Sequence, residues 1–155
     1  MGYNWIFAAY NQILAGEKHG TIGIIFPDHD IYEITTFRTE GGYQDARHPD
    51  WVKFVPNVEE DLARRDFTIN AMAYHPDRGL VDLFHGLEDM ENQVIRCVGN
   101  PMERFQEDAL RILRAVRFSA QLGFTIEENT REGIRSLAPN LKNVSAERIQ
   151  VELVK

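Results

Sequence analysis

Two short apolar runs early in the chain are separated by a polar turn. Residues 21–26 are rich in β-branched side chains and lie between Gly20 and Pro27, and residues 31–37 repeat that texture. Runs of this length and composition, bounded by turn-forming residues, predict a β-hairpin. Residues 1–15 form an apolar or helical segment, residues 39–50 read as a loop, and residues 51–55 predict another short strand.

Helical periodicity begins further along. Residues 57–66 predict a helix, with Asn57 as its N-cap and Glu60 at the third position of a capping box. The clearest helix is predicted over residues 101–121, because Pro101 suits a first turn and Gly123 suits a C-terminal end. Two further helices are expected near residues 127–137 and 144–155.

The helix predicted at residues 101–121 is amphipathic. On a wheel of about 100° per residue, its apolar side chains gather on one face and its charged side chains on the other. The apolar face contains Phe105, Ala109, Ile112, Leu113, Val116 and Ala120. The charged face contains Arg104, Glu107, Asp108, Arg111 and Arg114.

These elements predict an α+β chain in two parts. Residues 1–85 mix strands and helix, residues 86–100 read as a flexible linker, and residues 101–155 are all-helical. No internal repeat interrupts this division.

Composition is typical of a globular protein, with 43% apolar and 26% charged residues. The longest early apolar run is too short to cross a bilayer, so no membrane association is expected. The single cysteine, Cys97, excludes an internal disulfide, fits a reducing compartment such as the cytoplasm, and is expected to be a small core residue.

Charge is unevenly distributed. The net charge is −7, but residues 1–100 carry 8 Lys/Arg against 16 Asp/Glu, whereas residues 101–155 carry 9 against 8. An acidic first part suits a domain that holds divalent cations, although solvated carboxylates explain the same imbalance.

Asp108 and Arg111 could together recognise a nucleotide base. Cytosine and adenine both present an amino donor beside an unprotonated ring nitrogen, so a carboxylate and a guanidinium could bind them together. Guanine and uracil present the reverse order and would leave polar groups unpaired. The alternative is a solvated helix face with Arg104–Asp108 and Glu107–Arg111 ion pairs.

A second polar group lies where the helix at residues 57–66 ends. Arg64 and Arg65 suit the oxygens of a triphosphate, while Asp66 and Asn70 could hold ribose hydroxyls. The alternative is a helix end whose arginines face solvent and complement the helix dipole.

Several segments together resemble the class II tRNA nucleotidyltransferases, the family of CCA-adding enzymes and bacterial poly(A) polymerases. Residues 64–74 resemble the motif that binds ribose and triphosphate, and residues 107–118 resemble the base-reading motif. Residues 32–38 resemble the segment that supplies a third catalytic carboxylate, here Glu33. Residues 81–99 resemble the joint between head and neck, and residues 144–149 the motif that opens the last neck helix.

The resemblance implies a polymerase β-like head with a mixed or antiparallel sheet, followed by an all-α neck. It implies template-independent addition of CMP and AMP to tRNA 3′ ends, with CTP and ATP as substrates and Mg²⁺ as cofactor. The implied metal ligand and catalytic residue is Glu33. The implied nucleotide-binding residues are Arg64, Arg65, Asp66, Asn70, Glu107, Asp108, Arg111, Arg114 and Arg117.

The family's Gly-rich turn and Asp-x-Asp strand have no match in this chain. Asp28 and Asp30 have the right spacing, but they fall in the predicted hairpin turn with no Gly-rich turn before them. The resemblance therefore implies a head incomplete at its N-terminus and a neck truncated at Lys155, with tRNA gripped mainly by missing C-terminal domains. We expect no nucleotidyl transfer from this chain alone. Poly(A) addition and a non-catalytic nucleotide- or RNA-binding remnant are the alternatives.

Overall fold

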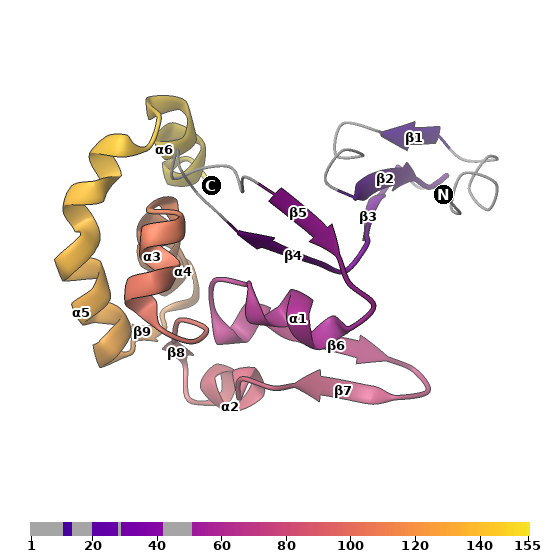
Figure 1. The fold of residues 1–155 in the computed structure, drawn as a ribbon, viewed down its shortest axis with the longest axis horizontal. Coiled ribbons are helices and arrows are strands. Elements are labelled where there is room, and N and C mark those ends of the chain that lie inside the picture. The colour runs from indigo at the N-terminus through magenta and orange to yellow at the C-terminus, as the bar shows by residue number, and fades with distance from the viewer. Residues whose placement is uncertain (1–10, 14–19, 28, 42–50) are drawn as a thin grey trace.

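The computed structural model describes residues 11–13, 20–27, 29–41 and 51–155 and has an α+β architecture. Figure 1 shows small antiparallel sheets in the first part of the chain and a group of helices in the last part. The predicted fold class is confirmed. One short strand in the last part, β9 (Thr125–Ile126), departs from the predicted all-helical neck.

The first sheet has the strand order β1-β2-β3 and contains the predicted hairpin. Its strands are β1 (Asn11–Ile13), β2 (Thr21–Ile25) and β3 (Ile31–Thr35), and all neighbours are antiparallel. The turn closes when the Phe26 amide donates to the Asp30 carbonyl at 3.0 Å, and His29 takes a φ of 68°. The hairpin turn predicted at Asp30 is therefore confirmed, whereas Asp28 lies outside the described residues.

A second sheet pairs β4 (Arg38–Gly41) with β5 (Trp51–Phe54). The strand predicted at residues 51–55 is confirmed. Strand β4, however, covers residues 39–41 of the loop predicted at residues 39–50, because the polar and glycine residues there gave no strand signal. The rest of that predicted loop, residues 42–50, lies outside the described residues, as do residues 1–10 and 14–19.

The predicted helix at residues 57–66 is α1 (Val58–Ala63), and it ends earlier than expected. Asn57 occupies the N-cap position, but its side chain bonds to the Glu60 carboxylate at 3.3 Å and caps no backbone N–H. The predicted capping box is therefore wrong, because the two side chains bond to each other and not to the backbone N–H groups. Beyond α1 follow η2 (Thr68–Asn70) and the hairpin of β6 (Met72–His75) and β7 (Gly79–Asp82).

Residues 86–100, predicted to be a flexible linker, contain a helix and a strand. These are α2 (Gly86–Glu91) and β8 (Val94–Ile95), and β8 pairs in parallel with β9. Ile95, Cys97 and Val98 are buried. Residues 86–100 therefore pack between the two parts of the chain, and the division into head and neck at this point stays a prediction.

The long helix predicted at residues 101–121 is wrong, because the structure has two helices there. Helix α3 (Pro101–Glu107) and α4 (Leu110–Leu122) are separated by Asp108 and Ala109, and the Asp108 backbone is extended with φ −145° and ψ 104°. The Asp108 carboxylate accepts the Leu110 N–H at 3.1 Å, a local bond that competes with helix continuation. The chain ends with α5 (Glu128–Leu137), η3 (Ala138–Asn143) and α6 (Ala146–Leu153).

One apolar core joins the two parts of the chain. Phe67 and Ile95 pack with Phe105 and Ile112, and all four are buried. The predicted apolar face is correct in its first half. Val116 and Ala120 are exposed, and Ala115 is the buried residue instead, because the break at Asp108 rotates α4 relative to α3.

Cys97 lies in this core, as predicted. Burial raises the pKa of its thiol to about 12, so the group is a neutral, inert thiol near neutral pH.

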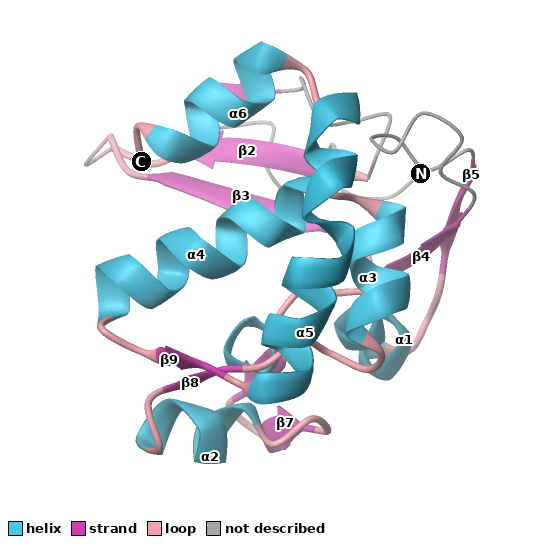
Figure 2. Cartoon of the chain, turned by 90° about the vertical axis from the view of Figure 1, so that its left-hand side faces the viewer, coloured by secondary structure: helices cyan, strands magenta, loops and turns pink. Residues whose placement is uncertain are grey.

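Figure 2 looks onto the side of the molecule that α3, α4, α5 and α6 form, with α3, α4 and α5 next to one another. Helix α5 packs on α3, and α6 packs on α4. Within the described part of the chain, no helix combines the length and the apolar character that a bilayer crossing needs.

Candidate functional site

A cavity of about 670 Å³ lies between the first part of the chain and the helices. Its walls come from β2, β3, the first residue of β4, the α1–η2 segment, the α3–α4 junction, α4 and α6. Six of the thirteen lining residues are arginines and two are aspartates, so the cavity is basic although the whole chain is acidic. The lining residues are Thr21, Thr35, Arg38, Arg64, Arg65, Asp66, Asn70, Asp108, Leu110, Arg111, Arg114, Phe118 and Arg148.

The predicted basic pair, Arg64 and Arg65, lines one wall just beyond the end of α1. The buried carboxylate of Asp61 holds both guanidinium groups: Arg64 Nη2 lies 2.7 Å from Oδ1, and Arg65 Nη2 lies 3.1 Å from Oδ2. Burial raises the pKa of Asp61, but hydrogen bonds from Arg64, the Arg38 N–H and Arg65, together with the charge of Arg64, outweigh it, so the pKa lies below its usual value.

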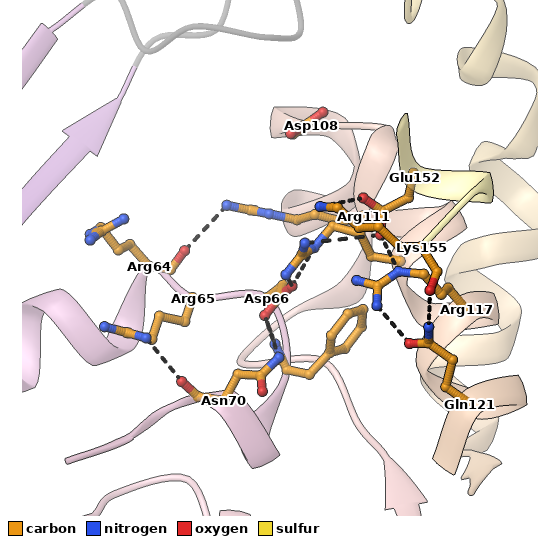
Figure 3. A network of polar contacts seen from close by, with 12 residues as sticks. Arg64, Arg65, Asp66, Asn70, Asp108, Arg111, Arg117, Gln121, Glu152 and Lys155 are labelled. Carbon is orange, nitrogen blue, oxygen red and sulfur yellow. Dashed lines mark hydrogen bonds and ion pairs between the residues drawn. The ribbon is translucent and has the colours of Figure 1, made fainter. Parts of the chain in front are cut away.

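Asp66 and Asn70, the predicted ribose-binding residues, lie next to each other in the cavity lining (Figure 3). Asp66 Oδ2 accepts from Arg114 Nε at 2.7 Å, and Oδ1 accepts the Phe67 N–H at 2.8 Å. The Asn70 amide reaches Oδ1 at 3.4 Å, the longest of these bonds. Asp66 is therefore well anchored, and Arg114 ties it to α4.

Asp108 and Arg111 line the same cavity as Arg65 and Asn70, although they do not lie one turn apart on one helix. The guanidinium of Arg111 is nearly buried and donates to the Glu107 carboxylate at 2.6 Å and to the Arg64 carbonyl at 3.2 Å. The alternative Glu107–Arg111 pair of the sequence analysis therefore forms, but on a buried rather than a solvated face.

The other alternative pair, Arg104–Asp108, is replaced by two different pairs. Arg104 Nη2 lies 2.7 Å from Glu107, and Asp108 pairs with Arg148 of α6. Arg148 Nη2 and Nη1 donate to the two carboxylate oxygens of Asp108 at 2.8 and 3.2 Å.

A polar network connects the cavity to the last helix (Figure 3). Glu152 of α6 is buried and accepts from Arg117 Nε at 2.6 Å, and Arg114 Nη1 lies 4.0 Å from the same carboxylate oxygen. Arg114 and Arg117 also stand over the Phe118 ring, 5.2 and 4.2 Å from its centroid. Arg117 is thus directed at Glu152 and is not part of the cavity lining.

Glu33 is exposed on β3, opposite Gly23, and does not line the cavity. It does share a strand face with Thr35, which does, because alternate residues of a strand point the same way. The described residues contain no group of three or more histidine, cysteine or carboxylate side chains placed to hold a metal ion. They do not by themselves fit a metal ion, and no catalytic step through a metal is derived from them.

The cavity thus brings together seven of the predicted site residues: Arg64, Arg65, Asp66, Asn70, Asp108, Arg111 and Arg114. It leaves out Glu33, Glu107 and Arg117. Sequence reasoning missed Asp61 and Arg148. The spacing of Asp61, three and four residues before the arginine pair, is a signal that could have been used. Arg148 lies 40 residues from Asp108, and no local pattern connects them.

Two family models match the chain. A model for the poly(A) polymerase head domain matches residues 4–96, and a model described as a probable RNA and SrmB-binding site of polymerase A matches residues 123–155.

The similar curated proteins are CCA-adding enzymes. The CCA-adding enzyme of Lactobacillus helveticus is 55% identical over 144 residues, which is 93% of this chain and 36% of that protein. The CCA-adding enzyme of Limosilactobacillus reuteri is 54% identical over 152 residues, which is 97% of this chain and 37% of that protein. The chain therefore spans 36–37% of the length of these relatives.

Solved structures of CCA-adding enzymes are also similar to this chain. The Bacillus stearothermophilus CCA-adding enzyme in complex with CTP superposes with a TM-score of 0.83 and 41% identity, covering 96% of this chain and 35% of that one. The Thermotoga maritima CCA-adding enzyme complexed with tRNA gives a TM-score of 0.70 and 30% identity, covering 88% of this chain and 30% of that one.

Proposed function

Because this chain belongs to the poly(A) polymerase head-domain family, which includes the CCA-adding enzymes, we propose that it is the nucleotide-selecting part of a tRNA nucleotidyltransferase. The whole enzyme would add CMP and AMP to tRNA 3′ ends, using CTP and ATP. One observation carries the proposal: residues of both nucleotide-binding motifs line a single basic cavity although more than 30 residues separate Asn70 from Asp108.

The cavity suits a nucleoside triphosphate in charge and in size. Six arginines against two aspartates leave a formal excess of four positive charges for a polyanion. A volume of about 670 Å³ lies within the usual range for small-molecule sites, which is roughly 300–1,000 Å³. Arg64 and Arg65 form the wall that would hold the phosphates, because a guanidinium group can donate two parallel hydrogen bonds to phosphate oxygens.

Asp108 would accept the amino group of cytosine or adenine. A carboxylate has about four acceptor positions, and three of those on Asp108 are filled, by the Leu110 N–H and by two bonds from Arg148. Among the described residues, Oδ2 receives only the Arg148 bond. One acceptor position is left for a single exocyclic amino group, and Arg111 would donate to the neighbouring ring nitrogen.

The ribose would lie beside Asp66 and Asn70. The Asp66 carboxylate already accepts from Arg114, from the Phe67 N–H and from Asn70. A ribose hydroxyl would replace the Asn70 bond, because at 3.4 Å it is the weakest of the set. The freed Asn70 amide could then turn to the same sugar.

Remaining assignments follow from the family. Glu33 would contribute one carboxylate to a Mg²⁺ site whose other ligands the described residues do not provide. The whole enzyme would bind tRNA mainly through domains outside this chain and would work in the cytoplasm.

Base selection is tested by calorimetric titration of the chain with CTP, ATP, UTP and GTP. We expect CTP and ATP to bind at least about tenfold more tightly than UTP and GTP, since an unpaired buried polar group costs about 1–3 kcal/mol. The Asp108→Ala variant should bind all four with similar affinity.

Glu132→Ala is the matched control, because it removes an exposed carboxylate from α5. Its nucleotide preference should equal that of the unaltered chain. Retained preference for CTP and ATP in Asp108→Ala would refute the role of Asp108. Equal binding of all four nucleotides by the unaltered chain would refute base selection by this cavity.

A further inference from the structure

Asp61 is a buried carboxylate directly behind the basic wall of the cavity. It lies on α1, three residues before Arg64 and four before Arg65, a spacing that puts the three side chains on one face of a helical turn. Only 4% of its side chain is exposed, and it is not part of the cavity lining. It could not contact a bound nucleotide directly.

The Asp61 carboxylate makes four hydrogen bonds, and three come from the arginine pair. Oδ1 accepts from Arg64 Nη2 at 2.7 Å and Nε at 3.1 Å, and Oδ2 accepts from Arg65 Nη2 at 3.1 Å. The fourth bond comes from the Arg38 N–H at 3.2 Å, at the first residue of β4. One carboxylate therefore fixes both guanidinium groups and joins α1 to the second sheet.

Each arginine also donates one bond to a backbone carbonyl, which by itself leaves the guanidinium group free to turn. Arg64 Nε also donates to the Arg38 carbonyl at 2.9 Å, and Arg65 Nη1 donates to the Asn70 carbonyl at 3.2 Å. Without Asp61, the two positive groups would repel each other and the four other arginines of the cavity. Their long side chains would then sample many rotamers, which a ligand would have to restrict on binding.

We propose that Asp61 is a positioning residue that pre-organises Arg64 and Arg65 for the phosphate groups of a nucleoside triphosphate. The inference rests on the proposed function of the cavity. It adds that the binding strength of the arginine pair depends on a negative charge behind it. Asp61 acts on the phosphates through the arginines and leaves the base-reading residues, Asp108 and Arg111, unchanged.

The sign of the effect distinguishes positioning from simple charge. If Asp61 acted only as a charge near the cavity, neutralising it would make the cavity more positive and would tighten the binding of a triphosphate. If Asp61 positions the arginines, neutralising it loosens them and weakens the binding. The two explanations predict opposite changes in the same dissociation constant.

The experiment is calorimetric titration of the Asp61→Asn variant with CTP, CMP and UTP. We expect the affinity for CTP to fall about tenfold and the affinity for CMP to change less than about twofold. The ratio of CTP to UTP affinity should stay the same. Glu59→Gln is the matched control, because it neutralises an exposed carboxylate on the same helix and should leave all three affinities unchanged.

Tighter or unchanged CTP binding by Asp61→Asn would overturn the proposal. Asp61→Glu provides a second test if the asparagine variant does not fold: it keeps the charge, displaces the carboxylate by one methylene and should weaken CTP binding by a few fold. Unchanged CTP affinity in that variant would equally overturn the proposal. A chain that binds CTP no better than CMP would instead contradict the phosphate-binding role of the cavity itself.

Discussion

Arg148 of α6 makes a bidentate contact with Asp108 at the α3–α4 junction. The Nη2–Oδ2 distance is 2.8 Å and the Nη1–Oδ1 distance is 3.2 Å, between residues 40 positions apart in the chain. Bidentate arginine–carboxylate contacts fix the plane of the carboxylate as well as its position. The direction in which Asp108 faces the cavity therefore depends on a helix that begins far downstream.

Removing the Arg148 side chain should weaken base discrimination. In Arg148→Ala, the Asp108 carboxylate keeps its bond from the Leu110 N–H but loses the two bonds from Arg148 that orient it. We therefore expect the CTP-to-UTP affinity ratio to fall about fivefold. Calorimetric titration with the two nucleotides measures this ratio. Arg135→Ala, which removes an exposed arginine from α5, should not change it, and an unchanged ratio in Arg148→Ala would show that Asp108 needs no such support.

Neutralising Glu152 should destabilise the packing of α6 on α4. Glu152 is buried against Arg117 at 2.6 Å, so Glu152→Gln leaves a partly buried guanidinium without its charge partner. We expect a loss of about 2 kcal/mol in the free energy of unfolding. Urea unfolding followed by circular dichroism measures it, with Glu132→Gln as the exposed control. A loss below about 0.5 kcal/mol would mean that the network in Figure 3 contributes little to stability.

Asp61 should make the protein sensitive to acid. Burial raises the pKa of Asp61, but the charge of Arg64 and the hydrogen bonds that Asp61 accepts lower the pKa by more. The folded-state pKa therefore lies below the unfolded value. The stability that this difference contributes is present above the unfolded pKa, near pH 4, and is lost as the pH falls through the folded pKa. Urea unfolding between pH 7 and pH 2.5 should show a shallower acid loss in Asp61→Asn than in the unaltered chain. Identical slopes would contradict the lowered pKa.

Gly86 should not tolerate a side chain. A Cβ at this buried position would lie 2.2 Å from the carbonyl oxygen of Thr68, which is backbone and cannot easily move. Gly86→Ala should therefore lower the free energy of unfolding by about 2 kcal/mol through forced displacement of α2 from η2. Thermal unfolding compares it with Glu88→Ala, an exposed change on the same helix, and equal melting temperatures would exclude the clash.

Local pattern was enough to predict much of the chain. The hairpin of β2 and β3, the start of α1, and helices α5 and α6 follow from composition and spacing, and all are confirmed. The residue types at 64, 65, 66, 70, 108 and 111 were enough to propose a nucleotide site, because their chemistry is complementary to phosphate, ribose and base. The family likeness was likewise visible in the order of the motifs, and the family is confirmed.

Tertiary structure decided how those residues are held. Asp108 breaks the predicted helix, and its carboxylate pairs with Arg148, while Arg114 pairs with Asp66 across 48 positions. Spacing along one helix reports only neighbours within a turn or two. Contacts between distant segments depend on how α4 and α6 pack on the first part of the chain. The sequence therefore determined which groups are available for binding, and only packing determined which of them face one cavity and which, like Asp61, hold the others from behind.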